Sequence, residues 1–215
     1  MSSVKLKKKL KSLSESTSEN HVIRLHRAIS WMKCAEEQED NIDLQFLSLW
    51  ISYNSCYSID DNLDTTFKER TQVNDFIYKL VNLDYEKRLY NLLWHKFSGP
   101  VRLLIANEYL FKPFWQYQRG NKVNWKQLHQ KSIDDSKKFL SEQKTEELLK
   151  IVLDRLYVLR NQLMHGGATY KSKINRLQMI DACNMLKLIV PVVIDIMIEH
   201  HEEDWGKIYY PVIKK

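Results

Sequence analysis

The chain has 215 residues, 44% of them hydrophobic and 28% charged, a balance typical of a folded globular protein rather than a disordered one. Its five glycines and four prolines are few for this length and indicate long helices. The net charge of +6 comes mostly from five lysines that precede Glu15, because without them the chain has 28 basic and 27 acidic residues. The charge therefore predicts a basic N-terminus, either solvated or in contact with phosphates, rather than a strongly basic body.

The cysteines and the apolar segments indicate the cellular compartment of the protein. Three widely spaced cysteines without a C-x-x-C pair predict reduced thiols. The apolar run 186–198 is too short to span a membrane and contains Lys187 and Asp195, so it predicts a buried helix. No secretory signal follows the first lysines. We expect a cytoplasmic protein with no membrane partner.

The N-terminal part of the chain predicts a tail followed by two helices. Residues 1–20 are expected to form a basic tail and a polar linker, in which Ser18 or Asn20 could cap the next helix. Apolar residues recur at helical spacing from His21 to about Gln38, and a second apolar helix is expected over 43–57.

The rest of the chain predicts further helices and no strand. A polar loop is expected over 58–72 and a long surface connection over 111–125. Helices are expected over about 72–83, 84–97, from Pro100 onward, 125–140, 145–165 and 173–200. Together these elements predict an all-α helical bundle as one domain over 21–200, with inserted helices over about 60–140 and a C-terminal tail over 201–215.

The stretch RNQLMHGG at 160–167 holds two of the five glycines, directly after a histidine. Asn161 and His165 are four residues apart, so they share a helix face at about 40°, and Asn161 could hold the imidazole. Arg160 is about 140° from His165, so the two side chains meet only if Arg160 wraps around, if the backbone leaves the helix at His165, or if a second subunit contributes. A simple helix C-cap is the alternative.

The stretch LRNQLMHGG resembles the R-x4-6-H signature of HEPN domains, which are compact helical bundles in which a polar residue such as Asn161 commonly follows the arginine. Two earlier stretches are also similar. HRAISWMKCAEEQ at 26–38 resembles the family's opening helix, and FLSLWISYNSCY at 46–57 is similar to the second helix of the larger, Apea-like branch. The resemblance covers about 25–57 and 145–200.

The resemblance implies a metal-independent endoribonuclease that acts at a homodimer interface and needs no cofactor. It makes His165 the general acid/base at the ribose 2′-OH and the leaving 5′-oxygen, and Arg160 the phosphate ligand. It also suggests a toxin or phage-defence effector with an antitoxin or defence partner protein. Because Gly167 stands where related toxins carry an adenylylated tyrosine, that mode of silencing is not expected here.

Two alternatives remain open at this point. HEPN-type modules without activity bind nucleic acid, nucleotides or proteins, and the fold alone does not decide between them and an enzyme. A plain helical dimer without a site is the other alternative. The near-continuous apolar run 186–198 also favours a dimer.

Further side chains are candidates for supporting roles. Asn54 and Glu36 are polar residues on apolar helices and could support Arg160 or His165, or could serve as a local hydrogen-bonder and as part of a charged run. RNA could be held by residues of the aromatic and basic segment 111–125, whose rings could equally pack inward: Lys112, Trp115, Arg119 and Lys122. No metal-binding motif is expected, and HHEED at 200–204 is read as a solvated helix end.

Overall fold

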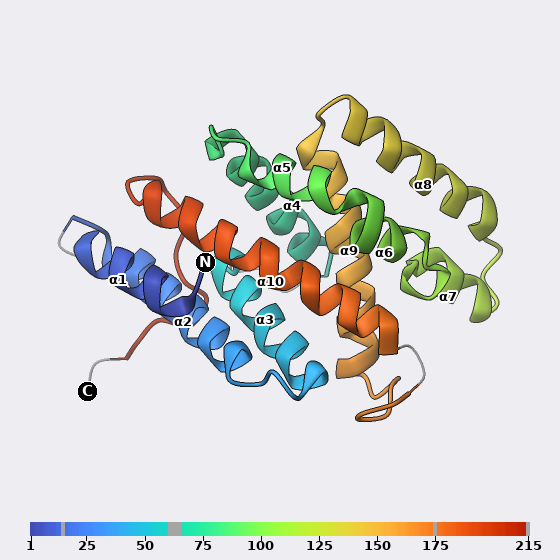
Figure 1. Cartoon of the computed structure of the whole chain (residues 1–215), viewed down its shortest axis with the longest axis horizontal. Coiled ribbons are helices and arrows are strands. Elements are labelled where there is room, and N and C mark those ends of the chain that lie inside the picture. Colours follow the sequence, from blue (N-terminus) through green and yellow to red (C-terminus); the bar gives the residue numbers. More distant parts are fainter. Residues whose placement is uncertain (14–15, 60–65, 174–175, 214–215) are drawn as a thin grey trace. The chain divides into compact units, whose positions relative to one another are not determined.

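The computed structural model describes residues 1–13, 16–59, 66–173 and 176–213, and over these ranges the chain is all-α, as predicted. The described residues contain no strand, and one isolated antiparallel bridge pairs Ile59 with Ile208. Figure 1 shows the α-helices, which are α1 (Ser3–Leu13), α2 (Glu19–Glu36), α3 (Ile42–Tyr57), α4 (Thr66–Leu83), α5 (Arg88–Lys96), α6 (Arg102–Ala106), α7 (Lys112–Gln118), α8 (Trp125–Ser141), α9 (Thr145–Met164) and α10 (Arg176–Glu199).

The chain divides into two compact units, whereas the sequence predicts a single domain over 21–200. The first unit comprises Met1–Glu86 and Leu186–Lys215, and the second comprises Lys87–Met185. The boundary falls inside α10, so this helix contributes its first part to the second unit and its remainder to the first. In both units apolar side chains are buried.

The helices with the clearest apolar periodicity are confirmed, namely α2, α3, α8, α9 and α10. Side-chain caps mark the starts of α2, α3 and α8. Ser18 is the N-cap of α2, and its hydroxyl accepts from the amide of His21 at 3.4 Å. Asn41 and Asn124 cap α3 and α8 in the same way.

Two predicted connections are wrong. The predicted loop 58–72 is helical from Thr66 onward, where Lys68, Glu69 and Arg70 have good helix propensity; its residues 60–65 lie outside the described residues. The predicted surface connection 111–125 contains α7, which Pro113 helps to start and in which Phe114 is buried. A polar or aromatic composition was therefore insufficient to exclude helix in either segment.

The predicted N-terminal tail is a helix that packs on α2. Leu6 and Leu10 lie one turn apart on α1 and are both buried, which leaves several lysines on the outer face. The amide and hydroxyl of Ser3 donate to the Glu36 carboxylate. Lys9 pairs with Asp195 at 2.5 Å and Glu199 at 2.7 Å. Residues 14–15 of the predicted linker lie outside the described residues.

A buried arginine ties the C-terminal segment to the first unit. Arg24 is 1% exposed, and its guanidinium donates to four backbone carbonyls, those of Cys56, Ser58, Gly206 and Lys207. Burial lowers the pKa of Arg24. The predicted C-terminal tail is therefore packed as far as Ile208, which is buried, and residues 214–215 lie outside the described residues.

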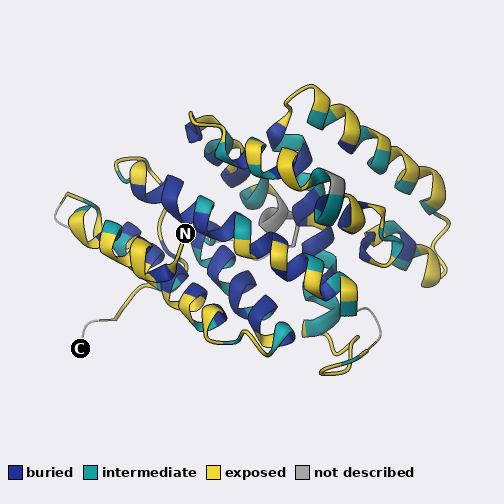
Figure 2. Cartoon of the chain, in the orientation of Figure 1, coloured by how far each residue is buried: buried dark blue, intermediate teal, exposed yellow. Residues whose placement is uncertain are grey.

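The apolar run of α10 is a buried helix, as predicted. Ile189, Val193 and Ile196 have no exposed surface, and Figure 2 shows this part of α10 as mostly buried. These side chains are already covered within the chain, so they offer no surface to a second copy. In the described ranges no helix combines the length and the apolar content that crossing a membrane requires.

The second unit is organised around α9, whose apolar stripe is buried as predicted. Arg155, in the middle of this helix, is 3% exposed. It donates to the hydroxyl of Ser132 at 2.9 Å and to the carbonyl of Ile105, and its guanidinium lies 4.4 Å from the centre of the Phe111 ring. Burial lowers the pKa of Arg155 to about 10. This side chain joins α6, α8 and the start of α7 to α9.

A buried histidine makes the stability of the first unit dependent on pH. The Nε2–H of His21 donates to the carbonyl of Met197 at 2.9 Å, and the ring stacks on Trp205. Desolvation, aided by the nearby charges of Arg24, His201 and Lys79, lowers the pKa of His21 to about 4. The neutral form is therefore the one that the folded state holds.

Acidification should destabilise the protein through His21. An unfolded histidine takes up a proton near pH 6.5 and folded His21 only near pH 4, so its contribution, about 3 kcal/mol, is present above pH 6.5 and lost as the pH falls to 4. Urea denaturation at pH 7 and at pH 4.5 should show a smaller loss for His21→Phe than for the wild type. The exposed control His26→Phe should lose as much as the wild type; equal losses in all three proteins would contradict the assignment.

Removal of the Arg24 guanidinium should destabilise the protein more than removal of its neighbour Arg27. Arg24→Met removes the donor to four carbonyls, of which the bond to Cys56 is buried and the other three are partly buried, and we expect a loss of at least about 3 kcal/mol in the free energy of unfolding. Arg27→Met on the same helix should cost less than about 1 kcal/mol. Denaturation midpoints of the two variants provide the measurement, and similar values would refute the role given to Arg24.

Candidate functional site

Arg160, Asn161 and His165 lie at the C-terminal end of α9, in the second unit. The helix ends at Met164, and Gly166 follows in the left-handed conformation with φ +69°, so the predicted glycine stop is confirmed. The break comes after His165, whose amide still donates to the carbonyl of Asn161 at 3.0 Å. The backbone therefore does not release His165 from the last helical turn.

The Arg160 side chain turns toward the face of the helix that carries His165. Its Nη1 donates to Oδ1 of Asn161 at 2.9 Å. A helix turns about 100° per residue, so Asn161 lies between Arg160 and His165 around the axis. The hydrogen bond thus directs the guanidinium toward the side of the helix on which His165 lies.

Asn161 binds the arginine rather than the histidine. The sequence predicts that Asn161 holds the imidazole, but its side-chain oxygen accepts from Arg160 instead. Within the described ranges no side chain hydrogen-bonds to the imidazole of His165, which is exposed. His165 is therefore open to a ligand or to a second copy of the chain.

On the other side of His165, Gln162 connects α9 to an aromatic group. Around the helix axis, Gln162 lies about 60° from His165, on the side opposite to Asn161. Its side-chain amide donates to the carbonyl of Tyr109 at 2.8 Å, and the indole N–H of Trp115 donates to the same oxygen at 2.7 Å. We call Tyr109 and Trp115 the aromatic platform; both are at least partly exposed, while Phe114 between them is buried.

The predicted RNA-binding residues thus divide into two groups. Trp115 reaches the end of α9 through the shared Tyr109 carbonyl. Lys112, Arg119 and Lys122 are exposed, and no contact among the described residues joins them to Arg160 or His165. Tyr109 and Gln162 were not predicted, although a helical wheel would have placed Gln162 beside His165.

Glu36 and Asn54, the two predicted supporting residues, have partners of their own in the first unit. The Glu36 carboxylate accepts from the amide of Ser3 at 2.9 Å at the start of α1. The Asn54 side-chain oxygen accepts from the hydroxyl of Tyr57 at 2.7 Å. A role for either beside Arg160 or His165 stays a prediction.

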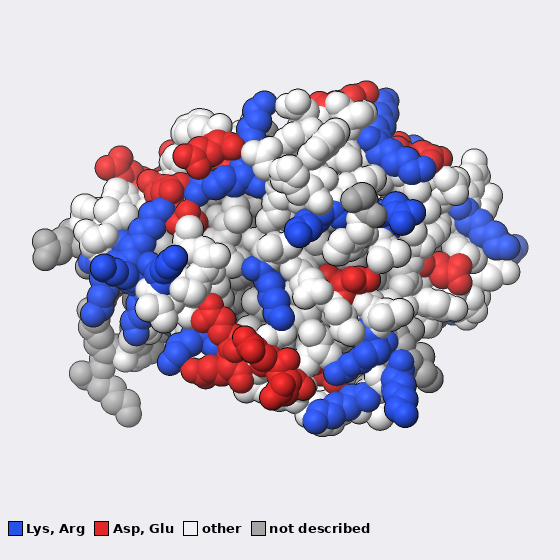
Figure 3. All heavy atoms as spheres, in the orientation of Figure 1, with Lys and Arg blue, Asp and Glu red and all other residues white. Residues whose placement is uncertain are grey.

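The charge of the chain is unevenly divided between the two units. The second unit has 18 Lys and Arg against 8 Asp and Glu, a net charge of +10, whereas the first has 15 against 19, a net charge of −4. Figure 3 shows a basic face over α1 and an acidic cluster over the turn from α2 to α3, both on the first unit. The chain without its N-terminal lysines is near-neutral, as the sequence predicts, only because a positive second unit and a negative first unit offset each other.

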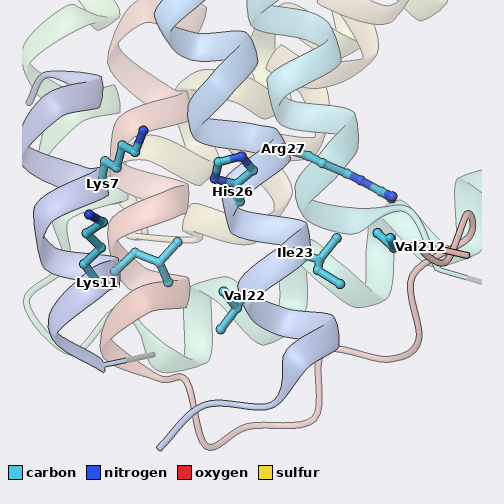
Figure 4. A pocket seen from close by; sticks show the side chains of 8 residues that line it. Lys7, Lys11, Val22, Ile23, His26, Arg27 and Val212 are labelled. Atoms are coloured by element: carbon cyan, nitrogen blue, oxygen red, sulfur yellow. The ribbon is translucent and has the colours of Figure 1, made fainter. Parts of the chain in front are cut away.

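A groove of about 380 Å³ lies between α1, α2 and the C-terminal segment of the first unit (Figure 4). We call it the α1–α2 groove, and its lining residues are Lys7, Leu10, Lys11, Val22, Ile23, His26, Arg27 and Val212. Figure 4 shows Lys7 and Lys11 extending from α1, with His26 and Arg27 on the facing helix.

The described residues contain no cluster of three or more His, Cys, Asp or Glu side chains that could hold a metal ion.

Comparison of the chain with protein-family models, with curated proteins and with solved structures found no significant match.

Proposed function

We propose that the second unit binds RNA and cleaves it at Arg160 and His165 without a metal ion, as a HEPN-type ribonuclease. The observation that carries the proposal is the net charge of +10 on the unit that holds both residues, because phosphate neutralisation dominates the affinity of nucleic-acid-binding proteins. The hydrogen bond from Arg160 to Asn161 supports the chemistry, since it turns the guanidinium toward the face of His165.

The residues suit a transesterification through the ribose 2′-OH. An imidazole takes the 2′-OH proton, the oxygen attacks phosphorus, and the 5′-oxygen leaves with a proton, which yields a 2′,3′-cyclic phosphate and a 5′-hydroxyl. Arg160 binds the non-bridging oxygens and offsets the charge of the transition state. A second copy of the chain would supply a second imidazole, so that one acts as base and the other as acid.

The aromatic platform gives the proposal a place for a base next to the phosphate site. His165 lies between Asn161 and Gln162 around α9, so a phosphate at Arg160 and His165 would have Tyr109 and Trp115 on its far side. Stacking of a base on an aromatic ring is tolerant of sequence. The substrate class is therefore single-stranded RNA.

Exposed apolar residues near the site in the sequence support a homodimer. The run 186–198 is buried, but Met164, the last residue of α9, is 57% exposed, and Tyr170 and Leu177, within the next 13 residues, are 60% and 77% exposed. A toxin or phage-defence role, with an antitoxin or defence partner, rests on the HEPN resemblance alone.

One observation favours the non-catalytic alternative. Since no described side chain orients the His165 imidazole, a binding module would need only the positive charge and the aromatic platform. Such a module would bind the same RNA without cleaving it.

Substitution of the two central residues should abolish cleavage. With purified protein and a mixed single-stranded RNA in EDTA, His165→Ala and Arg160→Ala should each lower the rate constant by about 10²- to 10⁴-fold. Asn161→Ala should lower it by about tenfold, because Arg160 loses one positioning hydrogen bond.

The exposed histidine His95, in the same unit, provides the matched control, and His95→Ala should cleave at the wild-type rate. Cleavage that persists in His165→Ala, or that EDTA removes from the wild type, would contradict the mechanism. RNA binding by a wild type that never cleaves would identify the non-catalytic module.

Loss of the platform ring should weaken RNA binding independently of cleavage. An oligonucleotide with 2′-O-methyl groups cannot be cleaved through the 2′-OH, so its affinity reports binding alone. Tyr109→Ala should weaken that affinity by about 5- to 100-fold, whereas Tyr109→Phe retains the ring and should bind like the wild type. Tyr78→Ala, at an exposed tyrosine of the first unit, should have no effect. Wild-type affinity of Tyr109→Ala would remove the platform from the proposal.

A further inference from the structure

The outer face of α1 carries two lysines without a partner. Leu6 and Leu10 are buried toward α2, and a helix turns about 100° per residue, so Lys8 lies on the opposite side of α1 and Lys5 lies next to it. Both lysines are exposed, and the side chain of neither forms an ion pair or a hydrogen bond with another residue in the described ranges. Lys9 differs from them, because it is paired with two carboxylates of α10. We call Lys5 and Lys8 the lysine patch.

The turn from α2 to α3 carries the opposite charge. Glu37, Glu39 and Asp40 are exposed in this turn. Glu37 pairs with Lys33 at 3.3 Å, but the carboxylates of Glu39 and Asp40 have neither an ion pair nor a hydrogen bond with any residue that the structure describes. We call Glu39 and Asp40 the acidic turn.

The lysine patch and the acidic turn are neighbours on one face of the first unit. The amide of Ser3, at the start of α1, donates to Glu36, at the end of α2, at 2.9 Å, so α1 begins beside the acidic turn. The helix rises about 1.5 Å per residue, which places Lys8 about 7 to 8 Å further along α1 than Ser3. Figure 3 shows the basic face over α1 and the acidic cluster over the turn in a single view. The two patches are thus close together and are not paired with each other.

We propose that this face binds a second copy of the chain about a two-fold axis between the patches, so that the lysine patch of each copy lies against the acidic turn of the other. A two-fold axis makes the contact reciprocal, and each lysine–carboxylate contact is therefore made twice. The contact uses residues of the first unit only. It is independent of the proposed RNA chemistry and of the exposed residues that follow α9, which belong to the second unit.

Each patch also has an exposed apolar side chain close to it in the sequence. Val4 is 71% exposed and precedes Lys5 on α1, and Leu44 is 42% exposed and follows the acidic turn in the first turn of α3. Interfaces between proteins combine an apolar centre with a charged rim. Val4 and Leu44 would provide apolar contact area beside the charges.

A second copy fits this face better than a polyanion or an anionic membrane does. Lys5 and Lys8 would attract either of these partners, but Glu39 and Asp40 on the same face would repel it, since exposed charges act over about 8 Å at physiological salt. A basic partner would meet the reverse conflict. A surface with both signs of charge in complementary order satisfies both patches, and a second copy of the chain has such a surface.

Sedimentation velocity of the full chain without nucleic acid, from about 10 to 500 µM protein, tests the contact. The wild type should associate at about 20 mM salt, and its affinity should be at least tenfold lower at about 500 mM salt, because screening weakens exposed ion pairs.

Charge reversal locates the contact. Lys5→Glu/Lys8→Glu should weaken self-association by at least about tenfold, because carboxylates then face carboxylates at both reciprocal contacts. Glu39→Lys/Asp40→Lys should weaken it to a similar extent, because lysines then face lysines. Unfolding curves should show that both variants are folded.

An equimolar mixture of the two variants should associate like the wild type. In a mixed pair, the reversed lysine patch of one variant meets the reversed acidic turn of the other, and the two unchanged patches meet as well, so every contact again joins opposite charges. Each reversal changes the net charge of +6 by four, to +2 and to +10, so the mixture cannot associate through opposite net charges.

Lys96→Glu/Lys131→Glu provides the matched control, because it makes the same change of net charge at exposed lysines of the second unit, and it should associate like the wild type. A dimer held by the residues after α9 would persist in both charge-reversal variants, and the particle mass would then fall by one association step rather than to the monomer.

Four results would overturn the proposal: a wild type whose particle mass is the same at low and high salt, an equal loss of association in the control, no loss in either charge-reversal variant, or no recovery in the mixture. Binding of anionic phospholipid vesicles by a wild type that does not self-associate would also overturn it, in favour of a membrane partner. RNA cleavage, whether present or absent, changes none of these outcomes.

Discussion

The first unit depends on one buried charge that has no carboxylate partner among the residues it hydrogen-bonds. Arg24 is solvated by four backbone carbonyls, two at the end of α3 and two in the C-terminal segment. A buried ion must replace its lost hydration with such contacts. The end of α3 and the segment around Gly206 are therefore held within hydrogen-bonding distance of the guanidinium. The stacking of His21 on Trp205 and the position of Val212 beside α2 both follow from that fixed segment.

Arg155 has a comparable part in the second unit. Its guanidinium joins the Ile105 carbonyl, the Ser132 hydroxyl and the Phe111 ring to the middle of α9. The middle of α9 is therefore enclosed by packed neighbours, whereas its last turn ends in exposed residues from Met164 onward. A helix that is packed along its middle and exposed at its last turn is a suitable support for side chains that must keep their geometry and still reach a ligand.

Most of the fold follows from apolar periodicity, and the errors have a common physical cause. The helices α2, α3, α8, α9 and α10 have apolar residues at helical spacing, a pattern that the local sequence shows without knowledge of the tertiary structure. In α1 the only buried apolar side chains are Leu6 and Leu10, which stand among lysines. Their burial stabilises the helix only because α2 covers them, and the local sequence does not show this contact. Arg24 and Arg155 are charged residues that composition places at the surface, and the carbonyls that solvate them come from distant parts of the chain.

The candidate site was partly predictable for a similar reason. The spacing of Arg160 and His165 and the glycine stop are local features, and the end of α9 follows them. The choice of partner for Asn161 was not predictable, because Arg160 and His165 are both within its reach on a helix. Tyr109 is 53 residues from Gln162, and only the packing of α9 on the turn before α7 brings its carbonyl to that side chain.

Charge segregation decides which part of the molecule a polyanion would meet. A net charge of +6 spread evenly would attract RNA weakly everywhere, but the units carry +10 and −4. The five N-terminal lysines, which dominate a reading of the sequence, belong to the unit that is negative overall, and one of them, Lys9, is neutralised by Asp195 and Glu199. Attraction to phosphate therefore comes chiefly from the unit that holds Arg160 and His165. Since the field of a protein steers its ligands before contact, a polyanion would be attracted to the second unit in preference to the first.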